Sequence, residues 1–220
     1  MEPCALVFDL DGTLWDASIP VAEIWTEIVR ERLDPNRTIT PEQVRGWMGK
    51  PMDEIIALAA PEIKDDPTII PEFSKSFLNR EIEYLKNHPG KLFHAEKRIL
   101  FALKEVGFRL YVVSNCQTGY IENFLSLMPE GLFSDHMCWS DTHAPKRVTI
   151  LECLKRNNET RAVYIGDTAG DESETHGAGL PFVFASYGFG KASSPEGVAA
   201  SFEDLPRAIE DALRGCSFSR

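Results

Sequence analysis

A short apolar run that leads directly into two carboxylates constrains this chain more than any other feature of its sequence. Residues 5–13 read ALVFDLDGT, so that Asp9 and Asp11 follow four apolar residues. A run of this length, bounded by Asp and Gly, is typical of a buried parallel strand. Ligands of open α/β sheets bind beyond the carboxyl ends of such strands, so Asp9 is predicted to lie at a binding site. An ordinary Asp-Gly turn after a strand is the alternative interpretation.

Length and charge limit the classes of function. A chain of 220 residues is long enough for one sizeable core, or for a core domain with a smaller insertion. Its formal net charge is −11, and nucleic-acid and anionic membrane partners need a basic face that such a chain does not favour. We therefore expect neither a nucleic acid nor a membrane as partner. An anionic ligand would be attracted locally, by a metal ion or by a few cations.

The cysteines and the N-terminus indicate a compartment. The five cysteines are odd in number and form no C-x-x-C pair, which favours free thiols in a reducing environment. The N-terminus has no positively charged region, and no segment approaches the length of a membrane span. These features predict a cytoplasmic protein.

Helical patterns interrupt a strand-helix alternation near the N-terminus. Between about residues 17 and 87 we find no convincing strand. The apolar residues Val21, Ile24, Trp25 and Ile28, and less regularly Leu78, Ile82 and Leu85, recur at helical spacing. Thr40 is predicted to cap a helix that begins at Pro41, with Gln43 completing the capping box. The segment is therefore expected to form an all-helical module.

After this segment the alternation resumes. Strands are predicted at 109–113, near 136–139, at 162–165 and at 182–185, with helices between them. The helix before the first of these strands is expected to include Ile99, Leu103 and Val106. The pattern predicts an α/β fold with a doubly wound parallel sheet. Residues 1–16 and 89–220 would form this core, and residues 17–88 an inserted helical domain.

Three further groups of polar residues follow predicted strands or begin a helix. Ser114 and Asn115 follow the strand at 109–113, and a hydroxyl with the backbone N–H groups after it suits phosphoryl oxygens. Lys146 begins a helix, where it could place a charge against a phosphate. Asp167 and Asp171 follow the strand at 162–165, and such oxygen ligands suit Mg²⁺. Taken individually, Ser114 and Asn115 have the alternative interpretation of an ordinary loop opening. Lys146 has the alternative interpretation of a solvated surface lysine.

In order and spacing, these motifs resemble the four motifs of the haloacid dehalogenase superfamily of phosphohydrolases. The helical insertion resembles that superfamily's C1-type cap, which indicates the phosphoglycolate-phosphatase-like group. The stretches 114–120 and 187–190 are similar to members of that group as well. The sequence departs from the pattern of that group at two positions. Pro145 precedes Lys146, whereas many relatives have a Lys-Pro order, and His176 stands where small residues are more usual. We interpret His176 as a packing or surface residue.

The resemblance implies a mechanism. Asp9 would be the nucleophile that forms an aspartyl-phosphate, and Asp11 the general acid and base. Mg²⁺ would be bound by Asp9, the Asp11 carbonyl and Asp167, with Asp171 holding metal-bound waters. Ser114, Asn115 and Lys146 would bind the phosphate. The expected reaction is hydrolysis of a small-molecule phosphate monoester, with a small phosphorylated metabolite as the binding partner.

Other activities stay open at this stage. A dehalogenase or a phosphonate hydrolase lacks the second carboxylate of the first motif, so Asp11 argues against both. A phosphomutase of the sugar-phosphate type keeps both carboxylates, and only product analysis separates it from a phosphatase. A receiver-like signalling domain phosphorylates an Asp on a later strand and has no helical insertion here. A non-catalytic phosphate-binding module is disfavoured by the complete set of motifs.

The sequence predicts neither the identity of the substrate nor the oligomeric state. Lys50 lies in a Met-Gly-Lys-Pro break between two predicted helices of the insertion. One hypothesis is that this cation contacts the substrate's leaving group or a distal carboxylate when the insertion closes. The alternative is a solvated loop lysine.

Overall fold

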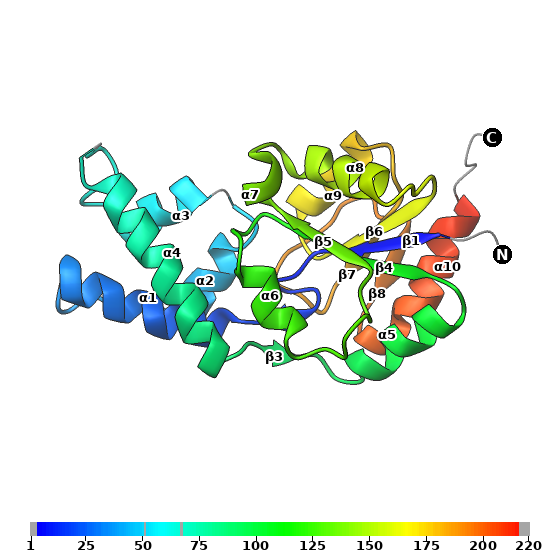
Figure 1. The fold of residues 1–220 in the computed structure, drawn as a ribbon, viewed down its shortest axis with the longest axis horizontal. Helices are drawn as coiled ribbons and strands as arrows, with labels where there is room; N and C mark the ends of the chain where they lie inside the picture. Colours follow the sequence, from blue (N-terminus) through cyan, green and yellow to red (C-terminus); the bar gives the residue numbers. More distant parts are fainter. Residues whose placement is uncertain (1–3, 51, 67, 216–220) are drawn as a thin grey trace. The chain divides into compact units, whose positions relative to one another are not determined.

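A computed structural model describes residues 4–50, 52–66 and 68–215, which form two compact units (Figure 1). The first unit comprises the described residues of Met1–Trp15 and of Leu92–Arg220, and the second is Asp16–Lys91. The chain passes between the units in strands β2 (Trp15–Asp16) and β3 (Lys91–Leu92), which pair with each other. Among the described residues, no helix has both the length and the apolar character to cross a bilayer.

A parallel sheet forms the centre of the first unit. In its described part, six strands pair in the order β5-β4-β1-β6-β7-β8. Their bounds are β1 Ala5–Phe8, β4 Arg109–Ser114, β5 Asp135–Cys138, β6 Ala162–Gly166, β7 Phe182–Ala185 and β8 Gly197–Ala199. The side chains of β1 are all fully buried, because β1 is central in the sheet and helices cover both faces. The predicted α/β class with a parallel sheet is confirmed.

Helices cover the two faces of this sheet. Helices α8 (Lys146–Arg156) and α9 (Ala169–Gly177) pack on one face, and α5 (Glu96–Glu105) and α10 (Leu205–Gly215) on the other (Figure 1). Shorter helical segments connect the strands, namely α6 (Tyr120–Leu125), α7 (Trp139–Thr142) and the 3₁₀ helix η1 (Phe202–Asp204). Tyr111, Ile150 and Tyr164 belong to the apolar core between the sheet and α8.

Two details of the first unit differ from the sequence predictions. The strand expected at 136–139 is β5, Asp135–Cys138, whereas Trp139 begins α7. The Trp139 N–H donates to the Cys116 carbonyl at 3.1 Å, and this bond holds the chain as it turns out of the strand. Val106, which the sequence places on the same helix as Ile99 and Leu103, follows the end of α5 and is 72% exposed.

The second unit contains four helices in its described part, where the sequence predicts a helical module. They are α1 (Ser18–Arg32), α2 (Pro41–Trp47), α3 (Met52–Ala59) and α4 (Ile70–Asn87). The predicted face of α1 is buried at Val21, Ile24, Trp25 and Ile28. The predicted cap is present as well, since Thr40 Oγ1 accepts from Gln43 N–H at 3.2 Å and Gln43 Oε1 accepts from Thr40 N–H at 2.9 Å.

The buried face of α4 differs from the one expected. Of the three residues predicted, Leu85 is buried, but Leu78 and Ile82 are only partly buried. The rest of the buried row consists of Phe73, Phe77 and Glu81. Phe77 packs against Trp25 of α1, with ring centroids 4.8 Å apart. Contact with α1 therefore selects the aromatic face of α4, which a count of aliphatic residues misses.

Candidate active site

The register of the sheet aligns the polar residues that follow its central strands. Phe8, the last residue of β1, pairs with Val112 of β4 and Ile165 of β6. Asp9, Ser114 and Asp167 therefore lie at the same edge of the sheet, because parallel strands end on one side. Asp9 is 3% exposed, Ser114 7% and Asp167 fully buried, so all three are largely withdrawn from solvent.

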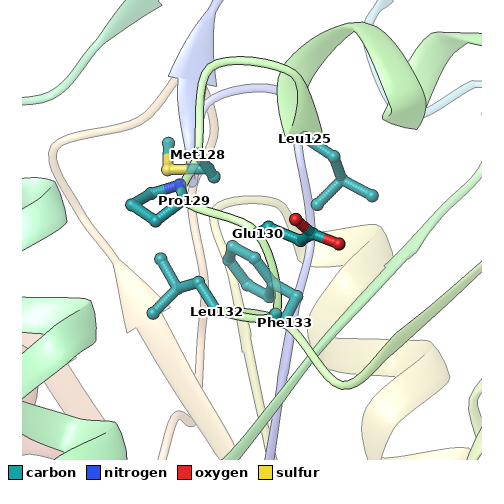
Figure 2. Close-up of a pocket in the computed structure, with 7 residues that line it drawn as sticks. Leu125, Met128, Pro129, Glu130, Leu132 and Phe133 are labelled. Carbon is teal, nitrogen blue, oxygen red and sulfur yellow. The ribbon is translucent and has the colours of Figure 1, made fainter.

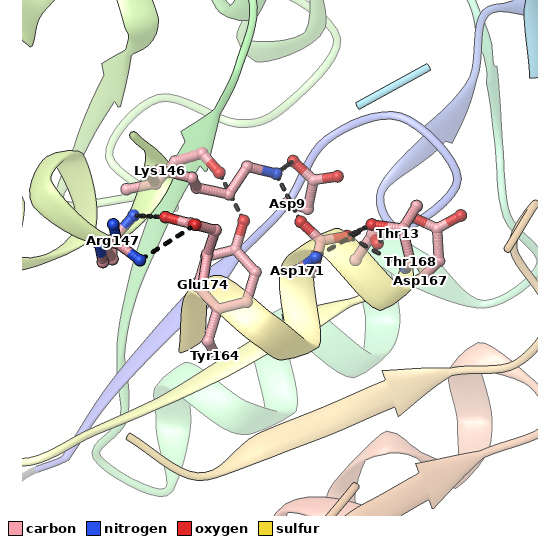
Figure 3. A network of polar contacts seen from close by, with 10 residues as sticks. Asp9, Thr13, Lys146, Arg147, Tyr164, Asp167, Thr168, Asp171 and Glu174 are labelled. Carbon is pink, nitrogen blue, oxygen red and sulfur yellow. Dashed lines mark hydrogen bonds and ion pairs between the residues drawn. The ribbon is translucent and has the colours of Figure 1, made fainter. Parts of the chain in front are cut away.

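Lys146 joins two of the carboxylates at this edge (Figure 3). Its Nζ lies 2.9 Å from Asp9 Oδ1 and 2.5 Å from Asp171 Oδ1, and all three side chains are buried. Burial by itself lowers the pKa of Lys146, but the negative charges of Asp171 and Asp9 outweigh it and hold the pKa well above its usual value. Lys146 is therefore a charged lysine that partly neutralises a buried acidic site.

Three carboxylates of this site are close enough to share one cation. Oxygen atoms of Asp9, Asp167 and Asp171 all lie within 4.8 Å of one another. Burial and the charge of Asp171 raise the pKa of Asp9 to about 6, although Lys146 opposes the shift. Burial and the charges of Asp171 and Asp9 also raise the pKa of Asp167 well above its usual value. Lys146 alone thus leaves an excess of negative charge, which a hard divalent cation would offset.

Asp171 is held in place by the start of its own helix. Its Oδ2 accepts from Thr168 Oγ1 at 2.6 Å and from Thr168 N–H at 3.1 Å, and Thr168 Oγ1 accepts from Asp171 N–H at 3.1 Å (Figure 3). This reciprocal pair caps α9. The T-x-x-D spacing of Thr168 and Asp171 is visible in the sequence, yet their role as a cap was missed there.

Close backbone packing positions Asp167. The Phe189 N–H donates to its Oδ2 at 2.7 Å, and Thr13 Oγ1 lies 3.5 Å from its Oδ1. A Cβ at Gly12, where φ is +80°, would lie 2.2 Å from Asp167 Oδ2, and one at Gly188 would lie 2.4 Å from Asp167 Cβ. A side chain at either glycine would displace the carboxylate, so both glycines allow Asp167 to sit against the backbone.

Asp11 lies outside the group of three carboxylates. Its Oδ1 accepts two hydrogen bonds of 3.0 Å, one from Trp15 Nε1 and one from the Tyr120 hydroxyl. Asp11 is 9% exposed, and Trp15 and Tyr120 are buried. Sequence reasoning missed both donors. Tyr120 ends the stretch 114–120, but nothing in its spacing connects it with Asp11.

Asn115, Lys50 and His176, which the sequence analysis also considered, differ in their exposure and in their contacts. Asn115 follows Ser114 and is half-buried. Lys50 lies between α2 and α3 in the second unit, where its half-exposed side chain pairs with Glu54 at 3.5 Å. His176 Nε2 lies 3.2 Å from Glu196 Oε2 near the surface of the first unit, which agrees with a packing or surface role.

A pocket of 310 Å³ lies in the segment that runs from the end of α6 towards β5 (Figure 2). None of the candidate site residues lines it. Its lining is mostly apolar and consists of Leu125, Met128, Pro129, Glu130, Gly131, Leu132 and Phe133.

Comparisons with known proteins agree on the relatives of this chain. The family model described as haloacid dehalogenase-like hydrolase matches residues 6–185. A phosphoglycolate phosphatase of Aquifex aeolicus is 26% identical over 216 residues, which cover 94% of this chain and 96% of that protein. Another, of Xylella fastidiosa, is 28% identical over 192 residues, covering 85% of this chain and 82% of that protein.

A solved structure shares the fold. The protein described as a predicted phosphoglycolate phosphatase from Haemophilus somnus 129pt superposes with a TM-score of 0.78 at 21% sequence identity. The superposition covers 95% of this chain and 99% of that one. At this level of identity the likeness concerns the fold alone.

Proposed function

Because this chain belongs to the haloacid dehalogenase-like hydrolase family, we propose that it is a magnesium-dependent phosphatase that hydrolyses a small phosphate monoester through an aspartyl-phosphate on Asp9. The observation that best supports the proposal is the buried group at the edge of the sheet. There, Lys146 contacts the Asp9 carboxylate at 2.9 Å, and Asp167 and Asp171 lie beside it.

In the first step, a carboxylate oxygen of Asp9 bonds to phosphorus while the P–O bond to the leaving group breaks. Asp11 gives its proton to the leaving oxygen, so the leaving group departs as an alcohol while the phosphoryl group stays on Asp9. In the second step, Asp11 takes a proton from a water molecule, and the water oxygen attacks phosphorus. The bond between Asp9 and phosphorus then breaks, which releases inorganic phosphate and restores both side chains.

The donor set fits a magnesium ion. Mg²⁺ prefers oxygen ligands and takes one or two carboxylates together with substrate oxygens and waters. The carboxylates of Asp9 and Asp167 and the Asp11 carbonyl would hold it, and Asp171, whose carboxylate already contacts Lys146 and Thr168, would hold metal-bound waters. When bound, the ion would offset the repulsion between the phosphate dianion and these carboxylates.

The phosphate oxygens would be bound by Ser114 and by the backbone around Asn115, which follow β4. Lys146 would supply a positive charge to the same oxygens in the transition state. In this proposal the second unit, which includes residues 17–88, serves as a cap that selects the substrate.

A panel of phosphate monoesters tests the proposed function, with 2-phosphoglycolate included because the relatives carry that name. Release of inorganic phosphate is measured for each compound with the wild-type protein, and Asp9→Asn serves as the blank. We expect Mg²⁺-dependent release together with the free alcohol. Conversion into an isomeric phosphate instead would indicate a phosphomutase, and absence of both products throughout the panel would contradict the proposal.

Metal removal is the first specific prediction. Activity should be lost when the protein is treated with a chelator and should return on addition of Mg²⁺. Asp167→Asn should weaken Mg²⁺ binding by about tenfold or more, because one charged ligand is lost. Calorimetric titration of the metal-free protein with Mg²⁺ measures the affinity directly.

The matched control is Asp204→Asn, which changes a carboxylate of η1 that bonds to Ser201. It should bind Mg²⁺ as the wild type does. Full activity in excess chelator, or equal Mg²⁺ affinities for Asp167→Asn and the control, would exclude the proposed metal site.

Substrate selection by Lys50 is a second prediction. If its cation contacts the part of the substrate distant from the phosphate, Lys50→Ala should lower kcat/KM for the best metabolite by about tenfold. An aryl phosphate that lacks that part should be nearly unaffected. Lys64→Ala, which removes another exposed lysine of the same unit, is the control. Equal effects on both substrates would make Lys50 a solvated loop residue.

A further inference from the structure

We propose that Trp15 and Tyr120 are positioning residues that hold the Asp11 carboxylate in one orientation for proton transfer; this inference rests on the proposed function. The Trp15 Nε1–H and the Tyr120 hydroxyl each donate to Asp11 Oδ1 at 3.0 Å. Both donors and Asp11 itself belong to the first unit, so the arrangement lies within one compact body.

The chemistry of the two donors makes Asp11 Oδ1 a hydrogen-bond acceptor. An indole N–H donates a hydrogen bond and accepts none, so Asp11 Oδ1 must act as an acceptor towards Trp15. The Tyr120 hydroxyl donates to the same oxygen. Two donors directed at Oδ1 stabilise negative charge on that oxygen, so they disfavour its protonation. The two bonds also define the plane of the carboxylate, because they limit rotation about its terminal torsion.

The donors are themselves firmly placed. Trp15 is fully buried, and its ring packs edge-on against Tyr120 at 5.6 Å and against Phe124 at 5.8 Å. The Trp15 carbonyl accepts from the Gly12 N–H at 2.9 Å, which closes the turn that begins at Asp11. Tyr120 is the first residue of α6, and just before it the Gly119 N–H donates to Glu122 Oε2 at 2.9 Å.

If Trp15 and Tyr120 only stabilised the fold, the loss of activity in their variants would not depend on the leaving group of the substrate. If they position Asp11 for proton donation, the loss should depend on it. An alkyl phosphate needs a proton on its leaving oxygen, and 4-nitrophenyl phosphate, whose leaving group is a stable anion, needs little help. The parameter to compare is kcat/KM, because it reports the steps up to departure of the leaving group and not the later attack of water.

The experiment compares Tyr120→Phe and Trp15→Phe with the wild type on 4-nitrophenyl phosphate and on the best alkyl phosphate of the panel. We expect each variant to lose about tenfold or more in kcat/KM on the alkyl phosphate and less than about threefold on the aryl phosphate. Asp11→Asn should show the same preference more strongly, because it removes the proton donor itself.

Tyr111→Phe is the matched control, since the Tyr111 hydroxyl also bonds to a buried carboxylate, that of Glu159, which no step of the reaction uses. It should leave the ratio of the two kcat/KM values unchanged, even if thermal unfolding shows a loss of stability. If Trp15→Phe does not fold, Tyr120→Phe decides the question.

Equal losses on both substrates in Tyr120→Phe, or no loss on either, would overturn the positioning role. The proposed function fails differently, through absence of wild-type turnover or through full activity of Asp9→Asn. The two failures are therefore distinguishable in one set of measurements.

Discussion

Asp9→Asn is expected to abolish turnover, by about ten-thousandfold or more, while the protein still folds. An amide has the shape of the carboxylate and an oxygen that can accept from Lys146, which lies 2.9 Å from Asp9 Oδ1. It lacks the negative charge that attacks phosphorus, so no aspartyl-phosphate forms. Steady-state release of phosphate gives the loss, and circular dichroism with thermal unfolding shows that the fold is kept.

Rapid-quench trapping provides the sharper test of the nucleophile. Wild-type protein mixed with substrate and quenched in acid should carry phosphate on the peptide that contains Asp9, and Asp9→Asn should carry none. Asp204→Asn, a conservative change in the same unit, should behave as the wild type. Phosphate found on any other side chain would show that the assignment of Asp9 is wrong.

Lys146→Met is expected to lower both kcat and stability. Methionine keeps most of the length of the side chain but removes the charge that contacts Asp9 and Asp171. Loss of a cation from the transition state should reduce kcat by about a hundredfold or more, and not merely raise KM. Breaking a buried pair leaves carboxylates without a partner, which costs about 3 kcal/mol in the free energy of unfolding. The kinetic constants and denaturant unfolding of the metal-free protein measure the two effects.

Lys155→Met is the matched control, because Lys155 lies on the same helix α8 and its side chain is 78% exposed. Such a surface pair contributes little, so both kcat and stability should stay near the wild-type values. Unchanged kcat in Lys146→Met would place that side chain outside the phosphate site. Unchanged stability would show that Lys146 does not neutralise the buried carboxylates.

Much of the sheet could be predicted because its determinants are local. The apolar run from Ala5 to Phe8 forms β1, and the predicted 162–165 lies within β6. Since parallel strands end at one edge, the positions of Asp9 and Asp167 after these strands were sufficient to predict that they meet. Their chemical roles stay predictions until the variants above are measured.

The sequence-based predictions were wrong where tertiary packing overrides the local pattern of apolar residues. The predicted face of α4 is correct at Leu85 and wrong at Leu78 and Ile82, because Trp25 of another helix packs against Phe77 instead. Trp139 was assigned to a strand, although a bond from its N–H to Cys116 accompanies the turn into α7. Neither partner lies near its residue in the sequence, so no window of neighbouring residues contains the information.

The sequence by itself determined the α/β class and most strands of the parallel sheet, and it identified candidate site residues, since strand patterns, helix caps and motif spacings depend on neighbouring residues. Only the tertiary structure decided which partners those residues have. Lys146 reaches Asp9 across 137 positions of the chain, and Tyr120 reaches Asp11 across 109. Contacts at such separations depend on the register of the sheet and the packing of its helices, which bring distant segments together only in the folded chain.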